Sequence, residues 1–371
     1  MFKKYFIYFR KSDWLLSLIA FFLVAFGLMG IYSTETSVVD SDFFNFKKQI
    51  IFFIIGICLM IFFSLLDYRY LKTYSMIIYG LGLLILILVL ISGIVIRGTQ
   101  GWLVLFGEQG FQPVEVAKIV LIIVLANFFT NWRAEITKIK NLLLIFLVAG
   151  TLIILVFMQP DFGSAFILIA IFLGLLFMTK IKKSYVISIL VILTIVVLLS
   201  WSFVLQDYQK NRVLTFLDTD RDPWGSGYNI KQSIIAVGSG QLFGRGLSLG
   251  PQSGLNFLPV QETDFIFAVI AEELGFVGSF LLMGFIVLLI YRLFRISQLA
   301  RDDFGLFVVG GIIIYLFAQS ILNIGMNIGV MPIAGVPLPF VSYGGSSLIA
   351  TFIMLGIAQS IYIRRETTVI G

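Results

Sequence analysis

The sequence predicts an all-α polytopic membrane protein with about ten transmembrane helices. The first observation is composition: 59% of the 371 residues are hydrophobic and 12% are charged, whereas soluble domains are about 45–50% apolar and about 25% charged. The second is that the apolar residues form continuous runs of about 20 residues, the length that spans about 30 Å of hydrocarbon. A β-barrel is disfavoured, because its strands alternate apolar and polar residues over about 10 positions.

Ten apolar segments are the expected spanning helices, and residues 1–371 are expected to form a single transmembrane domain. The segments are residues 14–33, 49–66, 74–92, 114–130, 142–158, 163–179, 184–205, 265–291, 304–328 and 346–363. The first follows a basic stretch and carries no small-residue cleavage site, so it is expected to be a helix and not a cleaved signal peptide. The fourth begins beside Pro113, which suits the first turn of a helix. The last begins at Ser346 or Ser347, each a natural N-cap.

The distribution of Lys and Arg orients these helices across the membrane. Cytoplasmic loops carry an excess of basic residues, and most of the 26 Lys and Arg residues share one side if the N-terminus is cytoplasmic. That side holds Lys3, Lys4, Arg10, Lys11, Arg69, Lys72, Arg133, Lys138, Lys140, Lys180, Lys182, Lys183, Arg292, Arg295, Arg301, Arg364 and Arg365. Both termini are therefore expected in the cytoplasm.

Two external segments stand out in this topology. The loop 206–263, between the seventh and eighth helices, is rich in Gly, Asp, Asn and Gln, and uninterrupted loops of this length are usually functional or disordered. Within it, YNIKQSIIAVG is expected to form a short interfacial helix. The second segment, GVMPIAGVPLPFVSYGGSS, precedes the last helix. Its Pro and Gly residues predict an irregular turn, which a membrane protein tolerates where the turn packs on protein or lines a cavity.

Several kinds of chemistry are excluded by residues that the chain lacks. There is no His, and the single Cys58 lies in an apolar run, so a Ser-His-Asp triad, a His-bound metal and an internal disulfide are all ruled out. Acid–base work is left to Asp, Glu, Lys or Tyr. The sequence indicates no nucleotide cofactor; a metal would need oxygen ligands and would be a divalent ion such as Mg²⁺. GSGQLFGRG does not fit a nucleotide-binding loop, because Phe243 replaces the third Gly and GK[ST] is absent.

Charged residues near the outer ends of the helices have both a structural and a functional interpretation. Glu115 and Lys118 are three residues apart and share a helical face. They form either an ion pair that lowers the cost of insertion, or a phosphate-binding lysine held in place by a carboxylate. Asp161 lies in MQPDFGSA, where Pro-Asp-x-Gly is first of all a turn sequence.

The stretch LPVQETDFIFAVIAEELG carries three carboxylates into a predicted apolar helix. A charge in hydrocarbon costs roughly 2.5–3.5 kcal/mol, so at least one of the three is expected to have a use. A Thr263 N-cap with Asp264 in the first turn would explain Asp264 by local structure alone. Glu272 and Glu273 follow about 12–14 Å further along a helix and point in different directions. Topology then places Asp264 at the external boundary and the two glutamates deeper, as structural or gating residues.

Taken together, six motifs resemble one protein family. The matching strings are QPVEVAK, QPDFGSA, NRVLTFLD, DPWGSGYNIKQSIIAVGSG, LPVQETDFIFAVIAEELG and NIGMNIGVMPIAGVPLPFVSYGGSS, in that order over residues 97–350. They resemble the SEDS proteins (shape, elongation, division and sporulation), which are polytopic glycosyltransferases that polymerise peptidoglycan. The compact length and the NIGM and GVPLPFVSYGGSS strings favour the elongation members over the division and sporulation members. Two positions depart from the family pattern: Gly101 precedes Trp102 where an Arg is usual, so that Arg97 is a candidate substitute, and Gln241 replaces a Gly.

The resemblance implies a reaction and a set of site residues. Asp264 would be the catalytic base, which deprotonates the glycan 4-hydroxyl of an acceptor lipid II and so releases undecaprenyl pyrophosphate from a lipid-linked donor. Substrate-binding roles are expected for Glu115, Lys118, Asp161, Arg212, Arg245, Gln252, Ser253 and Ser342. Among these, Lys118, Arg212 and Arg245 are the cations suited to pyrophosphate.

The resemblance also implies a location and partners. The expected location is the bacterial cytoplasmic membrane, with membrane lipids around the bundle. The expected protein partner is a class B penicillin-binding protein, and no nucleic acid is expected. Two other functions fit the same residues. A lipid II flippase would also use intramembrane carboxylates and a polar cavity, and a scaffold for a partner enzyme would need no catalytic residue.

Overall fold

The computed structural model describes residues 11–36, 42–96, 99–106, 109–132, 135, 138–179, 207–255 and 257–365, with isolated positions between 185 and 202. Eight of the helices in this part are long and apolar enough to cross a membrane. They are α2 (Trp14–Thr36), α3 (Phe44–Leu65), α5 (Ser75–Ser92), α6 (Pro113–Asn131), α7 (Ile139–Met158), α13 (Ile266–Gln298), α14 (Asp303–Asn327) and α15 (Gly345–Ile363). The chain is therefore a multi-pass α-helical membrane protein, as predicted.

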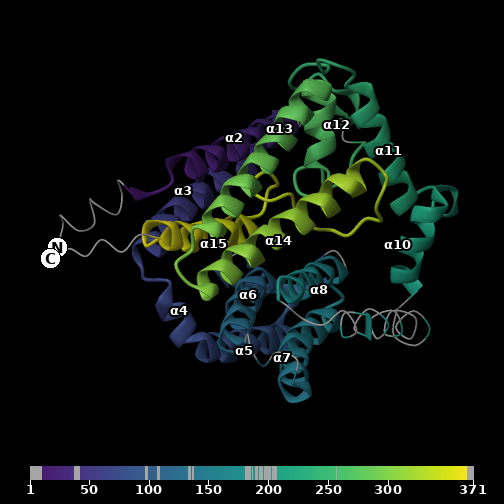
Figure 1. Cartoon of the computed structure of the whole chain (residues 1–371). Helices are drawn as coiled ribbons and strands as arrows, with labels where there is room; N and C mark the ends of the chain where they lie inside the picture. The colour runs from purple at the N-terminus through teal and green to yellow at the C-terminus, as the bar shows by residue number, and fades with distance from the viewer. Residues whose placement is uncertain are drawn as a thin grey trace.

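The shorter elements connect or cover these spans. They are α4 (Arg69–Thr73), α8 (Phe162–Phe177), α10 (Asp207–Leu217), the 3₁₀ turn η2 (Thr219–Arg221), α11 (Ser226–Ser239) and α12 (Pro251–Gly254). The apolar α8 falls on a predicted spanning segment, and α11 confirms the helix expected at YNIKQSIIAVG. The predicted span 184–205 lies outside the described residues apart from isolated positions. Figure 1 shows α10, α11 and α12 at the end of the bundle opposite α4 and the start of α2.

Helix α6 occupies the centre of the bundle. All its residues from Pro113 to Phe129 except Val116 are buried, as expected for a helix that is apolar on every side. It packs against α5, α8 and α14, while α3 pairs with α15 and α2 packs on α13 (Figure 1). The outer helices keep wide apolar faces exposed, among them Ile77 on α5 and Phe280 on α13. In a membrane these faces contact lipid, so their apolar side chains are not exposed to water.

The helix ends that are expected to be cytoplasmic are tied together by polar contacts. The Gln359 amide of α15 bonds both the backbone N–H and C=O of Asp13, at 2.9 and 2.7 Å. The Asp13 carboxylate pairs with Arg292 of α13, and Arg364 donates to the carbonyl of Leu65 at the end of α3. The start of α2 and the end of α15 therefore lie at the same face, as the predicted topology requires.

A small antiparallel sheet departs from the all-α prediction. Strands β1 (Ile94–Ile96), β2 (Thr99–Phe106) and β3 (Gln109–Phe111) pair in sequence order, with Trp102 opposite Ile94 and Leu103 opposite Phe111. The sequence between α5 and α6 is rich in β-branched, aromatic and Gly residues, which favour strands and tight turns. Three strands of this length are difficult to recognise in a sequence dominated by long apolar helices. They cover the end of α6 that is expected to be external.

Helix α13 is not the continuous span that the sequence predicted. Gly275 has φ +66° and ψ −161°, which divides the helix into segments 266–274 and 276–298. The free backbone groups at this break bond to the external loop. Phe276 N–H donates to the carbonyl of Gln241 at 2.8 Å. The carbonyls of Glu272 and Glu273 accept from the amides of Arg245 and Gly246 in the same loop, at 2.9 and 3.0 Å. Glu272 and Glu273 consequently lie at the break, not deep in a long helix.

Gly275 has no room for a side chain. A Cβ there would lie 2.3 Å from the backbone N of Gly244 and 2.7 Å from the carbonyl O of Leu242, and the positive φ adds strain of about 1–3 kcal/mol for any other residue. Gly275→Ala is therefore expected to lower the midpoint of thermal unfolding in detergent, measured by size-exclusion chromatography after heating. Gly284→Ala, on the same helix with nothing within 4 Å, should leave the midpoint unchanged or raise it. Equal midpoints for the two variants would contradict this role of the break.

Candidate active site

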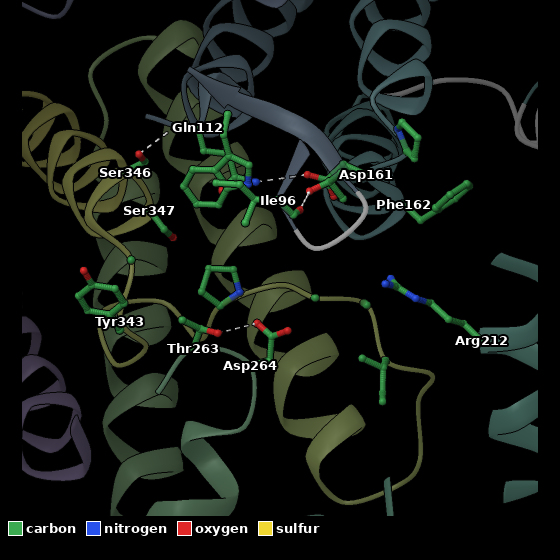
Figure 2. A pocket seen from close by; sticks show the side chains of 18 residues that line it. Ile96, Gln112, Asp161, Phe162, Arg212, Thr263, Asp264, Tyr343, Ser346 and Ser347 are labelled. Atoms are coloured by element: carbon green, nitrogen blue, oxygen red, sulfur yellow. Dashed lines mark hydrogen bonds between the residues drawn. The ribbon is translucent and has the colours of Figure 1, made fainter. Parts of the chain in front are cut away.

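A cavity of about 140 Å³ lies at the helix ends that the predicted topology places outside the cell. Its walls come from β1 and β2, from α8 and α10, and from the irregular segments that precede α6, α13 and α15 (Figure 2). The lining residues are Ile96, Thr99, Trp102, Gln112, Pro160, Asp161, Phe162, Arg212, Thr263, Asp264, Ile333, Ala334, Gly335, Pro337, Tyr343, Gly344, Ser346 and Ser347. The Pro- and Gly-rich segment before the last helix thus lines a cavity, as expected.

Asp264 is positioned mainly through its backbone. Its carbonyl accepts from the side-chain amides of Asn323 and Asn327 of α14, at 3.1 and 2.9 Å. Both asparagines are fully buried, so the loop before α13 is fixed to the core. The carboxylate accepts a hydrogen bond of 3.1 Å from the Thr263 hydroxyl (Figure 2) and faces the cavity just before the amino end of α13.

The predicted Thr263 cap of this helix is wrong. Helix α13 begins at Ile266 without a side-chain cap from the adjoining residues and with no acid in its first turn. Its third amide, Ala268 N–H, donates instead to Asn327 Oδ1 at 3.0 Å. A residue 59 positions away caps the helix, so the local explanation for Asp264 no longer holds. The expected Ser346 or Ser347 cap of α15 is also absent: Gly344 takes that position, and Ser346 accepts from Gln112 N–H.

Ser342 positions the loop next to Asp264 and does not line the cavity. It is 4% exposed. Its hydroxyl donates to the carbonyl of Thr263 at 2.5 Å and accepts from Leu338 N–H at 2.7 Å. The carbonyl of Ser342 accepts from the buried Gln49 of α3 at 3.1 Å. Three segments distant in sequence therefore meet directly behind Asp264, and direct contact of Ser342 with a substrate remains a prediction.

Asp161 and Arg212 join Asp264 in the cavity. Asp161 caps α8 through a 2.9 Å bond from Ser164 N–H, and its second oxygen faces the Gln112 amide at 3.4 Å. The turn interpretation of Asp161 is therefore confirmed, while its second oxygen stays at the cavity. Arg212 extends from α10 toward the cavity on the side opposite Tyr343 (Figure 2). The structure thus brings together three of the predicted site residues.

Two aromatic side chains complete the cavity wall. Trp102 of β2 is half-buried there, against Gly110 of β3. Burial, with smaller contributions from Glu262 and Glu35, raises the pKa of Tyr343 to about 12. Tyr343 is therefore neutral at physiological pH and offers a hydroxyl. Sequence reasoning did not select Trp102, Gln112 or Tyr343 as site residues, although all three lie in or beside the conspicuous external motifs.

Glu115 and Lys118 form a buried ion pair in α6. The Lys118 ammonium lies 2.8 Å from Glu115 Oε1 and 3.2 Å from Gln319 Oε1, and the two side chains are 1% and 0% exposed. Neither residue lines the cavity, but Gln319 connects the pair to its wall by donating to the carbonyl of Pro337 at 2.8 Å. This arrangement fits the interpretation of Glu115 and Lys118 as an ion pair, and a phosphate contact by Lys118 remains a prediction.

The other predicted residues lie at the far end of segment 266–274. Glu272 accepts from the amides of Gln252 and Ser253 at 2.8 and 2.9 Å. Arg245 is exposed, and its Nε donates to the carbonyl of Ser239 at 2.9 Å. Glu272 is eight residues from Asp264, about 12 Å along a helix, so these residues are not cavity residues. Arg97 lies outside the described residues.

The donor set of the cavity does not form an evident metal site. Within the described ranges, no group of three or more His, Cys, Asp or Glu side chains is placed to hold a metal ion. The two carboxylates of the cavity come from different elements, and Asp161 already accepts from Ser164. The cavity instead holds two carboxylates, Asp161 and Asp264, and one cation, Arg212, on a largely uncharged wall.

Removing Lys118 should be strongly destabilising, because it leaves the Glu115 charge buried and unpaired. Lys118→Met is expected to cost about 3–5 kcal/mol, measured as a lower midpoint of thermal unfolding, and adding Glu115→Leu should restore much of the loss. The matched control is the exposed i,i+3 pair Glu135–Lys138, where Lys138→Met should cost at most about 1 kcal/mol. If the Glu115→Leu/Lys118→Met variant were no more stable than Lys118→Met, the pair would not be the source of the effect.

Comparison with known proteins identifies the family. The FtsW/RodA/SpoVE family model, described as cell cycle protein, matches residues 13–367. The peptidoglycan glycosyltransferase MrdB of Escherichia coli K12 is 36% identical over 356 residues, which cover 94% of this chain and 93% of MrdB. The chain also resembles two solved structures.

The first belongs to a study of structural coordination of polymerization and crosslinking by a peptidoglycan synthase complex: TM-score 0.80, 30% identity, 96% of this chain and 99% of that one. The second is the rod shape determining protein RodA of Thermus thermophilus: TM-score 0.71, 28% identity, 95% and 96% coverage. The cavity is thus carried on a fold that these proteins share along almost their whole length. The chain belongs to the FtsW/RodA/SpoVE family, the SEDS proteins.

Proposed function

We propose that the chain is a peptidoglycan glycosyltransferase that polymerises lipid II at the outer face of the bacterial cytoplasmic membrane during cell elongation. The observation that carries the proposal is the cavity at the helix ends expected to be external. The Asp264 carboxylate and the Arg212 cation both line this cavity. MrdB, the relative in Escherichia coli, is a peptidoglycan glycosyltransferase, and a lipid-linked sugar reaches such a cavity from the outer leaflet without crossing the membrane.

Asp264 serves as the general base in this reaction. Its carboxylate takes the proton from the glycan 4-hydroxyl of the acceptor, and the freed oxygen attacks the anomeric carbon of the lipid-linked donor. The new C–O bond forms as the bond from the anomeric carbon to the pyrophosphate oxygen breaks. The electron pair leaves with undecaprenyl pyrophosphate. The rigid attachment of the Asp264 backbone to Asn323 and Asn327 supports this role, because a base must keep hydrogen-bond distance to its substrate.

The other cavity residues bind and orient the donor and acceptor substrates. Arg212 faces the negative charge that develops on the departing pyrophosphate, and a guanidinium suits two phosphate oxygens at once. Trp102 offers an aromatic surface to the apolar face of a sugar ring, and the neutral hydroxyl of Tyr343 offers a hydrogen bond. Asp161, anchored by Ser164 and Gln112, can accept from a sugar hydroxyl.

A protein that cross-links the product is the proposed partner. One structure that this chain resembles comes from a peptidoglycan synthase complex in which polymerization and crosslinking are coordinated. We propose that the partner here is a class B penicillin-binding protein, whose single transmembrane helix packs on the bundle. Its transpeptidase domain would then receive each strand as it leaves the external cavity.

Replacing the base should abolish polymerisation without unfolding the protein. Purified Asp264→Asn is expected to make no glycan strands from lipid II, whereas the wild-type chain makes strands that are resolved by gel electrophoresis. The loss of a catalytic acid–base group typically costs about 10²–10⁴-fold in rate. Asp220→Asn is the matched control, because Asp220 is an exposed loop carboxylate paired with Lys231, and it should retain full activity.

The same preparations distinguish the alternative functions. In proteoliposomes with fluorescent lipid II, dithionite-sensitive flipping without strand formation would support a flippase and contradict the proposal. Strand formation by Asp264→Asn at the wild-type rate would remove Asp264 from the mechanism. Absence of both strands and flipping with every preparation, including one that contains the penicillin-binding partner, would leave only a scaffold role.

A further inference from the structure

Two buried carboxylates of α13 take no part in the proposed reaction. Glu272 and Glu273 are 0% and 2% exposed, and a buried charge is tolerated only where hydrogen bonds compensate for the water it has lost. Glu273 accepts from the Ser33 hydroxyl of α2 and from Ser248 N–H. Glu272 accepts from two consecutive loop amides, Gln252 and Ser253, one on each oxygen. Both carboxylates therefore bind the external loop to α13.

The loop is shaped to reach the Glu272 carboxylate. A Cβ on Gly250 would lie 2.6 Å from both Cδ and Oε2 of Glu272, so only glycine admits the carboxylate at this point. Gly240 and Gly244 show the same fit: a Cβ on either would lie about 2 Å from the carbonyl oxygen of Ala271 or Glu273. These glycines let the loop lie directly on segment 266–274.

Segment 266–274 is held at both ends and carries Asp264 at one of them. At the cavity end, Asn327 binds the carbonyl of Asp264 and the amide of Ala268. At the other end, Glu272 and the break at Gly275 hold the segment to the loop. A short helix between two attachments transmits any displacement of one end to the other. The place of Asp264 in the cavity therefore depends on contacts about 12 Å away.

We propose that Glu272 is a positioning residue. Its carboxylate binds residues 250–253 to segment 266–274, a contact called the clasp below, and thereby fixes the position of Asp264 at the cavity. The inference rests on the proposed function of Asp264 and extends it to a residue that contacts neither substrate nor the reacting atoms. The Glu272 carboxylate accepts two backbone N–H groups, one on each oxygen, whereas a glutamine would place an NH₂ group against one of them. Glu272→Gln therefore loosens the clasp while it keeps the volume of the side chain.

The test compares Glu272→Gln with Gly250→Ala, which attacks the same contact from the loop side. Each variant, assayed with purified lipid II, is expected to lower kcat by about 10- to 100-fold and to leave KM within about twofold, because the binding wall is unchanged and the base is displaced. The double variant should be no slower than the slower single variant, since both changes break one contact. Gly238→Ala, in α11 of the same external segment, is the matched control, because a Cβ there would meet nothing within 4 Å, and it should retain the wild-type kcat.

Hydrogen–deuterium exchange provides a readout that needs no activity. Glu272→Gln should speed exchange at the amides of Gln252 and Ser253 and also across residues 266–270, whereas Gly238→Ala should not. A wild-type kcat in both Glu272→Gln and Gly250→Ala, multiplied losses in the double variant, or unchanged exchange at 266–270 would each overturn the positioning role. If the wild-type chain made no glycan, the proposed function would fail by itself, and the exchange at 266–270 would still decide whether the clasp holds the segment.

Discussion

The structure depends on one constraint: backbone N–H and C=O groups that are buried away from water must find hydrogen-bond partners within the protein. A helix that breaks at Gly275 frees such groups, and the external loop supplies the partners, through Gln241 for the N–H of Phe276 and through loop amides for the carbonyls of Glu272 and Glu273. The break therefore requires the loop. The loop in turn requires glycines to lie close enough to the helix, which explains a composition that otherwise suggests a flexible linker.

The break also accounts for the separation of the three carboxylates in this stretch. Asp264 precedes a short helical segment and faces the cavity, while Glu272 and Glu273 end that segment and bind the loop and α2. The protein thus uses similar side chains for two purposes. Of the three, only Asp264 lines the cavity, whereas the oxygens of Glu272 and Glu273 accept from amides and a hydroxyl outside it. The buried Glu115–Lys118 pair adds a third arrangement, in which a charge is balanced inside the bundle core.

Much of the fold could be predicted from properties that act locally. Apolar runs of spanning length identified the helices. The contacts that join Asp13 to Gln359 place the start of α2 and the end of α15 at one face, as the distribution of Lys and Arg predicted. The sequence also identified three residues that meet in the cavity, Asp161, Arg212 and Asp264. Contacts between distant residues were not predictable. Asn327 caps a helix 59 positions away, a cap that no local pattern encodes, and Gly275 looks like any helical glycine until the loop is placed beside it.

The most direct test of the central claim is a structure of the Asp264→Asn variant with lipid II bound. The claim is that Asp264 acts as the base for a lipid-linked sugar in the external cavity. It predicts that the 4-hydroxyl oxygen of the acceptor sugar lies about 2.6–3.2 Å from the side chain at position 264, with the donor pyrophosphate beside Arg212. Sugars bound outside this cavity, or an acceptor hydroxyl directed away from position 264, would contradict it.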